Sequence, residues 1–200
     1  MLKVIGITNT IEYKGKRAGK PVSQIILADD EGNCRFDLMT SDDVLEAGLL
    51  KCVTITGEEP LKVSGIEKLI DALLYNDHEV NIITKGGFDI TALLSDIRIH
   101  EEDKLFFTIE YQIASKENSA INANLESLMP EDVISFTIFD DDDYKNMLEA
   151  VKRIKPYYDY YTYPQIFISC SHERERIKTL EQKVINEPLL ENAHIQIICS

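Results

Sequence analysis

The stretch CVTITGEEPLKVSGIEKLIDALLYNDHEVNIIT, residues 52–84, contains the pattern that decides the fold. It opens with a β-branched run at residues 52–56 and closes with a second run at residues 79–84. Between the runs, apolar residues recur at helical spacing, at Ile66, Leu69, Ile70, Leu73 and Leu74. Ser64 and Glu67 have the S-x-x-E spacing of a capping box, which predicts a helix beginning at Ser64. Strand, helix and strand in this order predict a parallel βαβ unit.

The same alternation extends over the rest of the chain. Further strands are predicted at residues 2–8, 22–28, 104–113, 133–139, 165–169 and 194–199. Further helices are predicted after the acidic run 140–143, at residues 172–186, and as shorter pieces at 41–47, 89–95 and 124–128. We expect one α/β domain over residues 1–200, with a mostly parallel sheet, helices outside, and ligands at the carboxyl ends of the strands.

Composition limits the classes of partner. The chain has 200 residues, 44% of them hydrophobic, and a formal net charge of −14. This charge repels polyanions, so nucleic acid is not an expected partner. No segment has the apolar length of a membrane span, and the N-terminal residues 1–7 lack the pattern of a signal peptide, so we expect a soluble, cytoplasmic protein without a membrane partner.

The cysteines do not form a recognisable metal or redox motif. Cys34, Cys52, Cys170 and Cys199 are far apart in the sequence, without the close pairs of zinc ribbons or redox dithiols. We expect them to be reduced and mostly buried. Three of them follow predicted strands, and a three-thiolate metal site at the carboxyl ends of those strands is the less favoured alternative.

The loop after the strand at residues 52–56 carries the first resemblance to a known family. Thr56-Gly57-Glu58-Glu59-Pro60-Leu61 is similar to the T-G-G-E-P-L motif of radical S-adenosylmethionine proteins. In that superfamily, backbone groups and the glutamate hold the amino group of the cofactor's methionine. The resemblance implies a cofactor-binding loop, here vestigial, at Thr56, Gly57, Glu58, Glu59 and Pro60.

Further matches, in the same order and spacing, resemble the 7-carboxy-7-deazaguanine synthases of the queuosine pathway. They are residues 15–19 with G-x-x-A-G, 84–86 with T-N-G, 107–112 with F-T-x-D-Y-K, and 128–136 with L-T-x-x-D-x-V-K-F. The resemblance implies the partial (β/α) barrel of radical S-adenosylmethionine enzymes and a homodimer. It also implies a substrate-like pocket formed by Gly15, Thr84, Lys85, Glu110 and Gln112.

The chain departs from this family where the family binds iron. A C-x-x-x-C-x-x-C loop supplies three thiolates to a [4Fe–4S] cluster, which binds S-adenosylmethionine. The corresponding residues 28–40 contain one cysteine, Cys34, and their carboxylates are hard oxygen ligands that favour a solvated acidic turn. Glu58 replaces the second glycine of the cofactor motif, and residues 24–27 lack an arginine able to hold a carboxylate. We therefore expect no cofactor, no metal ligands and no catalytic residues.

Three functions remain open. The first is a catalytically inactive relative of 7-carboxy-7-deazaguanine synthase, kept as a module that binds a protein or a small ligand. A tyrosine-rich stretch at residues 156–164 is a candidate protein contact, although a surface loop packed on the sheet edge is favoured. The second is an enzyme that works without a cluster, through Glu59, Lys85, Glu110 and Cys34. The third is an active radical enzyme of this family with atypical cluster binding. The acidic run 140–143 is interpreted as a helix N-terminus and not as a metal site.

Overall fold

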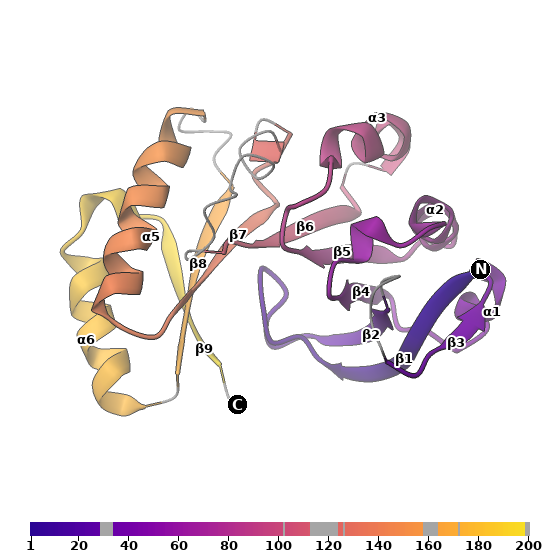
Figure 1. Cartoon of the computed structure of the whole chain (residues 1–200), viewed down its shortest axis with the longest axis horizontal. Coiled ribbons are helices and arrows are strands. Elements are labelled where there is room, and N and C mark those ends of the chain that lie inside the picture. Colours follow the sequence, from indigo (N-terminus) through magenta and orange to yellow (C-terminus); the bar gives the residue numbers. More distant parts are fainter. Residues whose placement is uncertain are drawn as a thin grey trace.

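The computed structural model describes residues 1–28, 34–101, 103–112, 124–125, 127–157, 164–171 and 173–198. These residues form a nine-stranded sheet in the order β3-β1-β2-β4-β5-β6-β7-β8-β9 (Figure 1). The strands are β1 (Leu2–Ile11), β2 (Pro21–Leu27), β3 (Asp37–Met39), β4 (Cys52–Gly57), β5 (Glu79–Thr84), β6 (Leu105–Glu110), β7 (Val133–Ile138), β8 (Gln165–Ser171) and β9 (Ala193–Ile198).

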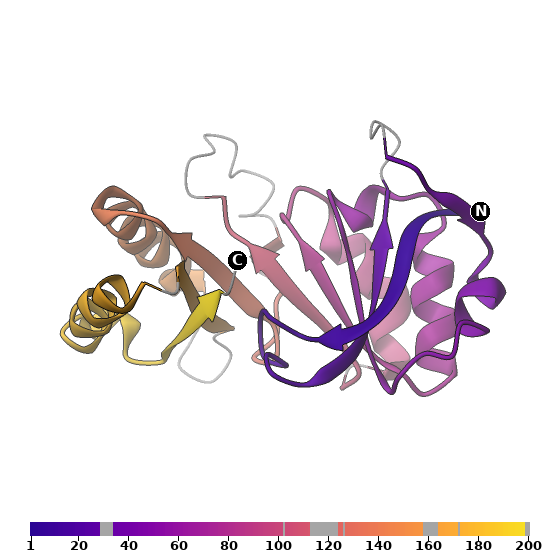
Figure 2. The same cartoon turned by 90° about the horizontal axis from the view of Figure 1, so that it is seen from below.

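The sheet is parallel from β2 to β9, whereas β1 runs antiparallel to both β2 and β3. Strands β3 and β9 are its two edges, so the barrel is open (Figure 2). The predicted fold class, a mostly parallel α/β sheet with helices outside, is confirmed. The antiparallel β1 allows the tight hairpin at residues 12–20 that leads into β2, since parallel strands need a longer crossover.

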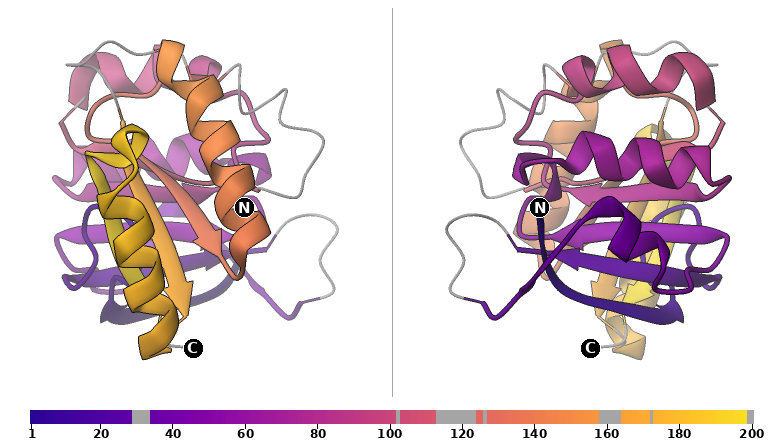
Figure 3. Two further views of the ribbon diagram at one scale, coloured as in Figure 1. Left: turned by 90° about the vertical axis from the view of Figure 1, so that its left-hand side faces the viewer. Right: turned by 90° about the vertical axis from the view of Figure 1, so that its right-hand side faces the viewer.

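The helices are α1 (Ser41–Leu45), α2 (Ile66–Tyr75), α3 (Ile90–Glu101), α5 (Asp141–Ile154) and α6 (Arg174–Ile185), with short 3-10 turns η1 (Pro60–Lys62), η2 (Lys155–Tyr157) and η3 (Pro188–Leu190). Helices α1 and α2 lie toward one end of the sheet and α5 and α6 toward the other (Figure 3). Among the described residues, no helix combines the length and the apolar character that a membrane crossing needs.

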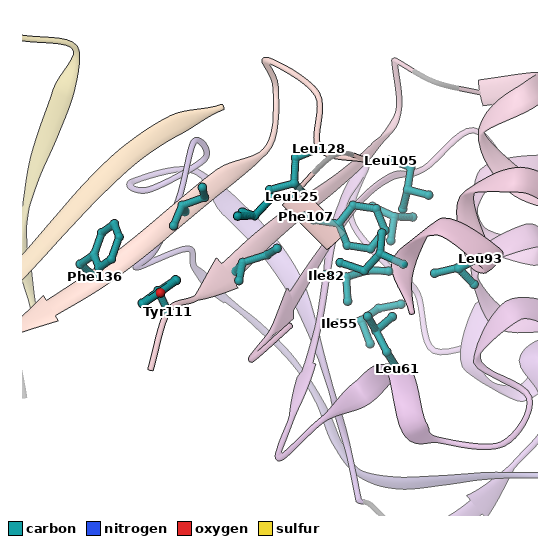
Figure 4. Packing of buried hydrophobic residues seen from close by; sticks show 14 of the residues in the cluster. Ile55, Leu61, Ile82, Leu93, Leu105, Phe107, Tyr111, Leu125, Leu128 and Phe136 are labelled. Carbon is teal, nitrogen blue, oxygen red and sulfur yellow. The ribbon is translucent and has the colours of Figure 1, made fainter. Parts of the chain in front are cut away.

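Alternate residues of the strands face the helices and form the hydrophobic core. Ile55, Ile82 and Phe107, from three adjacent strands, are fully buried in this layer (Figure 4). Burial of such side chains stabilises the fold by about 1.5–3 kcal/mol each. The remaining strand positions point to the opposite face of the sheet, which we call the inner face.

Several local predictions need correction. The capping box is wrong: α2 begins at Ile66 after Gly65, which has a φ of 88° and makes no side-chain cap. Strand β3 was not predicted, because its three residues are a short edge without a buried face. By contrast, the interpretation of the acidic run is confirmed, since Asp140 caps α5 by accepting hydrogen bonds from the backbone of Asp142 and Asp143. Most of the tyrosine-rich stretch lies outside the described residues.

Candidate functional site

Glu59 joins the loops that follow β4 and β5 at the carboxyl end of the sheet. Its side chain is 6% exposed. Oε1 accepts hydrogen bonds from Thr84 Oγ1 at 2.5 Å and from the Leu61 backbone at 3.4 Å, and Oε2 accepts one from the Lys85 backbone at 3.2 Å. The Thr84 hydroxyl in turn accepts from the Gly86 backbone at 3.0 Å. Glu59 therefore has a positioning role, because it fixes two loops to each other.

The neighbouring residues of this loop have different environments. Gly57 pairs with Leu27 of β2, and a Cβ at this position would lie 2.3 Å from the Leu27 carbonyl oxygen. Glycine is therefore required for the close approach of the two strands. Glu58 points to solvent, with its side chain 70% exposed, and forms an ion pair with Lys85. Its carboxylate adds negative charge at the carboxyl end of the sheet, which we call the mouth, and it takes no part in the hydrogen bonds of Glu59.

Asn124 holds the loop that follows β5. Its side-chain nitrogen donates to the backbone oxygens of Gly86 at 2.9 Å and Phe88 at 2.6 Å, and its Oδ1 accepts from the Ile90 backbone at 2.9 Å. The side chain is 1% exposed. The same loop is thus tied to Glu59 at one end and to Asn124 at the other, which fixes the backbone near Lys85.

The hairpin at residues 12–20 reaches across the inner face of the sheet toward β9 (Figure 1). Glu12 is 2% exposed and accepts a hydrogen bond from Thr54 of β4. Gly15 has a φ of 72°, and a Cβ there would lie 2.6 Å from Thr108 Oγ1. The Gly15 backbone also exchanges hydrogen bonds with the Gln196 side chain of β9, at 3.2 and 3.3 Å. The hairpin is therefore anchored at both sides of the inner face.

Six residues of the hairpin and of the inner face form what we call the polar ring: Lys14, Gly15, Glu110, Ser135, Ser169 and Gln196. Lys14 forms an ion pair with Glu110, and these side chains are 14% and 27% exposed. Glu110 is the register partner of Ser135 across β6 and β7, and Ser169 is the partner of Gln196 across β8 and β9. Gln196 accepts a hydrogen bond from the Gly15 backbone, so the last strand of this group is connected back to the hairpin. The polar ring combines a cation, a carboxylate, an amide and two hydroxyls.

Two members of the polar ring have unused hydrogen-bonding capacity. Ser135 and Ser169 are 3% and 0% exposed. Among the described residues, theirs are the buried side-chain oxygens that lack a hydrogen-bond partner. A buried hydroxyl without a partner costs about 1–3 kcal/mol. Two buried hydroxyls without partners on adjacent strands indicate a place where a ligand or an ordered water molecule supplies the missing hydrogen bonds.

The structure brings together some of the predicted site residues. Thr84 and Lys85 meet Glu58 and Glu59 at the mouth, whereas Gly15 and Glu110 belong to the polar ring. Thr56 lies in β4, Pro60 begins η1, and Gln112 lies beyond β6 and is exposed.

Sequence reasoning missed Lys14, Ser135, Ser169 and Gln196. Ser135 and Ser169 each interrupt an apolar strand, and that interruption is the one signal that could have drawn attention to them.

The described cysteines do not gather at one place. Cys34 is exposed, Cys52 is partly buried at the start of β4, and Cys170 is buried. Cys170 lines a cavity of about 190 Å³ between α5 and α6, on the helix side of the sheet. Burial raises the pKa of its thiol. Cys199 lies outside the described residues, as do Asp29, Asp30 and Glu31.

No group of three or more metal-ligating side chains occurs among the residues that the structure describes. Residues 28–40 contain one cysteine, Cys34, so this loop alone does not supply the three thiolates of a [4Fe–4S] cluster.

Comparisons with known proteins found a similar fold and a partial match in sequence. No family profile matches the chain. Its fold is that of QueE from Escherichia coli, with a TM-score of 0.72 and 15% identity, over 100% of this chain and 94% of that one. The match shows the fold, a mostly parallel α/β sheet shared with that protein.

The sequence supplies the closer relationship. The chain is 30% identical to 7-carboxy-7-deazaguanine synthase from Clostridium acetobutylicum over 129 residues, 61% of this chain. The match spans 56% of that enzyme, little more than half of its length. Over this part of its length the chain is similar in sequence to 7-carboxy-7-deazaguanine synthase, as its motifs indicated.

This relationship corrects one prediction. The expectation of no cofactor is contradicted, because the homologues of this chain use a [4Fe–4S] cluster and S-adenosylmethionine. The prediction relied on the single cysteine of residues 28–40, on Glu58 in the cofactor motif and on the lack of an arginine at residues 24–27. Residues 56–60, which resemble the cofactor motif, lie at the carboxyl end of β4.

Proposed function

We propose that the chain is a 7-carboxy-7-deazaguanine synthase-like binding module that holds a small bicyclic heteroaromatic ligand of the 7-deazaguanine class against its polar ring. In this proposal the protein binds the ligand and does not turn it over. The observation that carries the proposal is the pair of buried hydroxyls, Ser135 and Ser169, which lack partners among the described residues.

The chemistry of the polar ring matches such a ligand. A 7-deazaguanine has hydrogen-bond donors and acceptors along its edges, and its 7-carboxy derivative adds a negative charge. The hydroxyls of Ser135 and Ser169 can donate and accept. Lys14 can meet the carboxylate of the ligand, and Glu110 can accept from its ring N–H or amino groups. The ligand class follows from the name of the clostridial relative.

Isothermal titration with 7-carboxy-7-deazaguanine tests the proposal. We expect saturable binding, and we expect S135A and S169A each to weaken it about fivefold, the equivalent of one hydrogen bond of about 1 kcal/mol. Each variant also removes a hydroxyl that has no partner, so the stability of the free protein should stay equal or rise. Opposite changes in affinity and stability distinguish a ligand contact from a structural one.

The matched control is S95A, because Ser95 is exposed on α3 and should change neither quantity. Absence of binding to the wild type, or equal affinity in S135A, S169A and the wild type, would refute the proposal.

The second candidate is the enzymatic activity of the relative, favoured by the 30% identity over 129 residues. Anaerobic reconstitution with iron and sulfide, followed by an iron count, a visible spectrum and an assay for product, separates the two candidates. Product formation would replace the binding-module proposal. A reconstituted protein that forms no product but still binds 7-carboxy-7-deazaguanine would support it.

A further inference from the structure

A pocket separate from the cavity beside Cys170 lies at the amino-terminal end of the parallel strands, opposite to the loops that contain Glu59 and Lys85. It has a volume of about 100 Å³, which is small beside the roughly 300–1,000 Å³ of most ligand pockets. Its lining includes Lys16, Arg17, Lys20, Glu79, Asn81 and Glu131. Glu79 and Val133 begin β5 and β7, so this pocket is separate from the loops at the carboxyl ends of those strands.

Three cations from the hairpin at residues 12–20 converge on this pocket, in a protein whose net charge is −14. Lys16 and Arg17 lie over the Phe106 ring, 5.8 and 5.6 Å from its centroid. Arg17 is already engaged: it donates to the backbone oxygens of Glu79 and Val53 at 2.9 and 3.0 Å. It also lies 4.0 Å from the Glu79 carboxylate.

Lys16 and Lys20 differ from Arg17, because in the part of the chain that the structure describes their ammonium groups are not held in ion pairs. The carboxylates that line the pocket are Glu79, which faces Arg17, and Glu131, which is exposed. The lining therefore has one positive charge in excess, with Lys16 and Lys20 available to a ligand.

A buried side chain in the pocket also has donors to spare. Asn81 is 4% exposed, and its Oδ1 accepts a hydrogen bond from Thr108 Oγ1 at 3.0 Å. No hydrogen bond of its amide nitrogen is found among the described residues. This nitrogen is not among the fully buried atoms that lack a partner, so it is open to the pocket, where its N–H groups can donate to an acceptor.

We propose that this pocket binds a small oxyanion, specifically a phosphate group, between the side-chain amide of Asn81 and the ammonium groups of Lys16 and Lys20. The donors of the site are two charged groups and one neutral amide, a combination that suits a compact multivalent anion. The small volume admits a phosphate group and leaves any larger body that carries it in solvent. The inference is independent of ligand binding at the polar ring.

Titration of the ¹⁵N-labelled full chain with sodium phosphate, against sodium chloride at equal ionic strength, tests the proposal. We expect the side-chain NH₂ resonances of Asn81, identified by their loss in N81S, to shift with saturation in phosphate and not in chloride. The double variant K16Q/K20Q should weaken binding at least about fivefold. Both lysines are exposed, so this variant is expected to keep the fold.

The matched control is K68Q, which removes an exposed cation on α2 and should leave the phosphate affinity unchanged. Unshifted Asn81 resonances at saturating phosphate would overturn the proposal. An equal phosphate response in the wild type and in K16Q/K20Q would overturn it too, because the two ammonium groups would then not contribute to phosphate binding.

Discussion

Replacement of Glu59 by alanine tests whether this residue positions the loops of the mouth. The variant E59A removes the acceptor of three hydrogen bonds, from the Thr84 hydroxyl and from the backbones of Leu61 and Lys85. Hydrogen bonds to charged groups contribute about 1.5–3 kcal/mol each, and part of this is recovered when released donors reach water. We therefore expect a loss of about 3 kcal/mol in the free energy of unfolding.

Urea and thermal unfolding followed by circular dichroism measure this loss. For a chain of this size, 3 kcal/mol corresponds to a decrease in Tm of about 6–12 °C. The neighbouring variant E58A is the matched control, because Glu58 has an exposed side chain and forms only the ion pair with Lys85. Such pairs contribute about 1 kcal/mol or less. If E59A and E58A lowered stability equally, the positioning role of Glu59 would be refuted.

Two further predictions concern single positions. Hydrogen bonds and charge from Lys51 and Lys104 lower the pKa of Asp77 to about 2, below its usual 3.8, so the ionised form is favoured in the folded state. This stabilisation is present above pH 4 and is lost as the pH falls toward 2. The urea midpoints of wild type and D77N should therefore differ at pH 5 and converge at pH 2; a constant difference would contradict this. G57A should lower the free energy of unfolding by about 1–3 kcal/mol, because its Cβ would lie 2.3 Å from a carbonyl oxygen of β2. G6A, with nothing within 4 Å of the added atom, should be close to wild type in the same urea experiment, and equal effects would contradict the crowding.

The βαβ unit was predictable because its signals are local. The run at residues 79–84 coincides with β5, and the apolar spacing after Gly65 places the buried face of α2 correctly. The start of that helix was not predictable from the S-x-x-E spacing, since the positive φ of Gly65 turns the chain immediately before Ile66. The first residue of a helix depends on backbone conformation as well as on the capping pattern, and here the conformation of Gly65 sets the start of α2 at Ile66.

The candidate site was predictable only in part. The loop that contains Glu59 was found by its resemblance to a motif, and its partners Thr84 and Lys85 were expected nearby. The polar ring depends on strand register and on the path of the hairpin at residues 12–20. Ser135 and Gln196 come from separate strands. No pattern along the sequence shows that the Ser135 hydroxyl lacks a hydrogen-bond partner or that the Gln196 side chain binds Gly15.

A crystal structure of the chain soaked with 7-carboxy-7-deazaguanine tests the central claim most directly. The account predicts electron density for the bicyclic ligand against the inner face, with the hydroxyls of Ser135 and Ser169 within hydrogen-bond distance of it and its carboxylate beside Lys14. Ligand bound elsewhere, or a soaked crystal in which ordered water alone meets the two hydroxyls, would contradict the account.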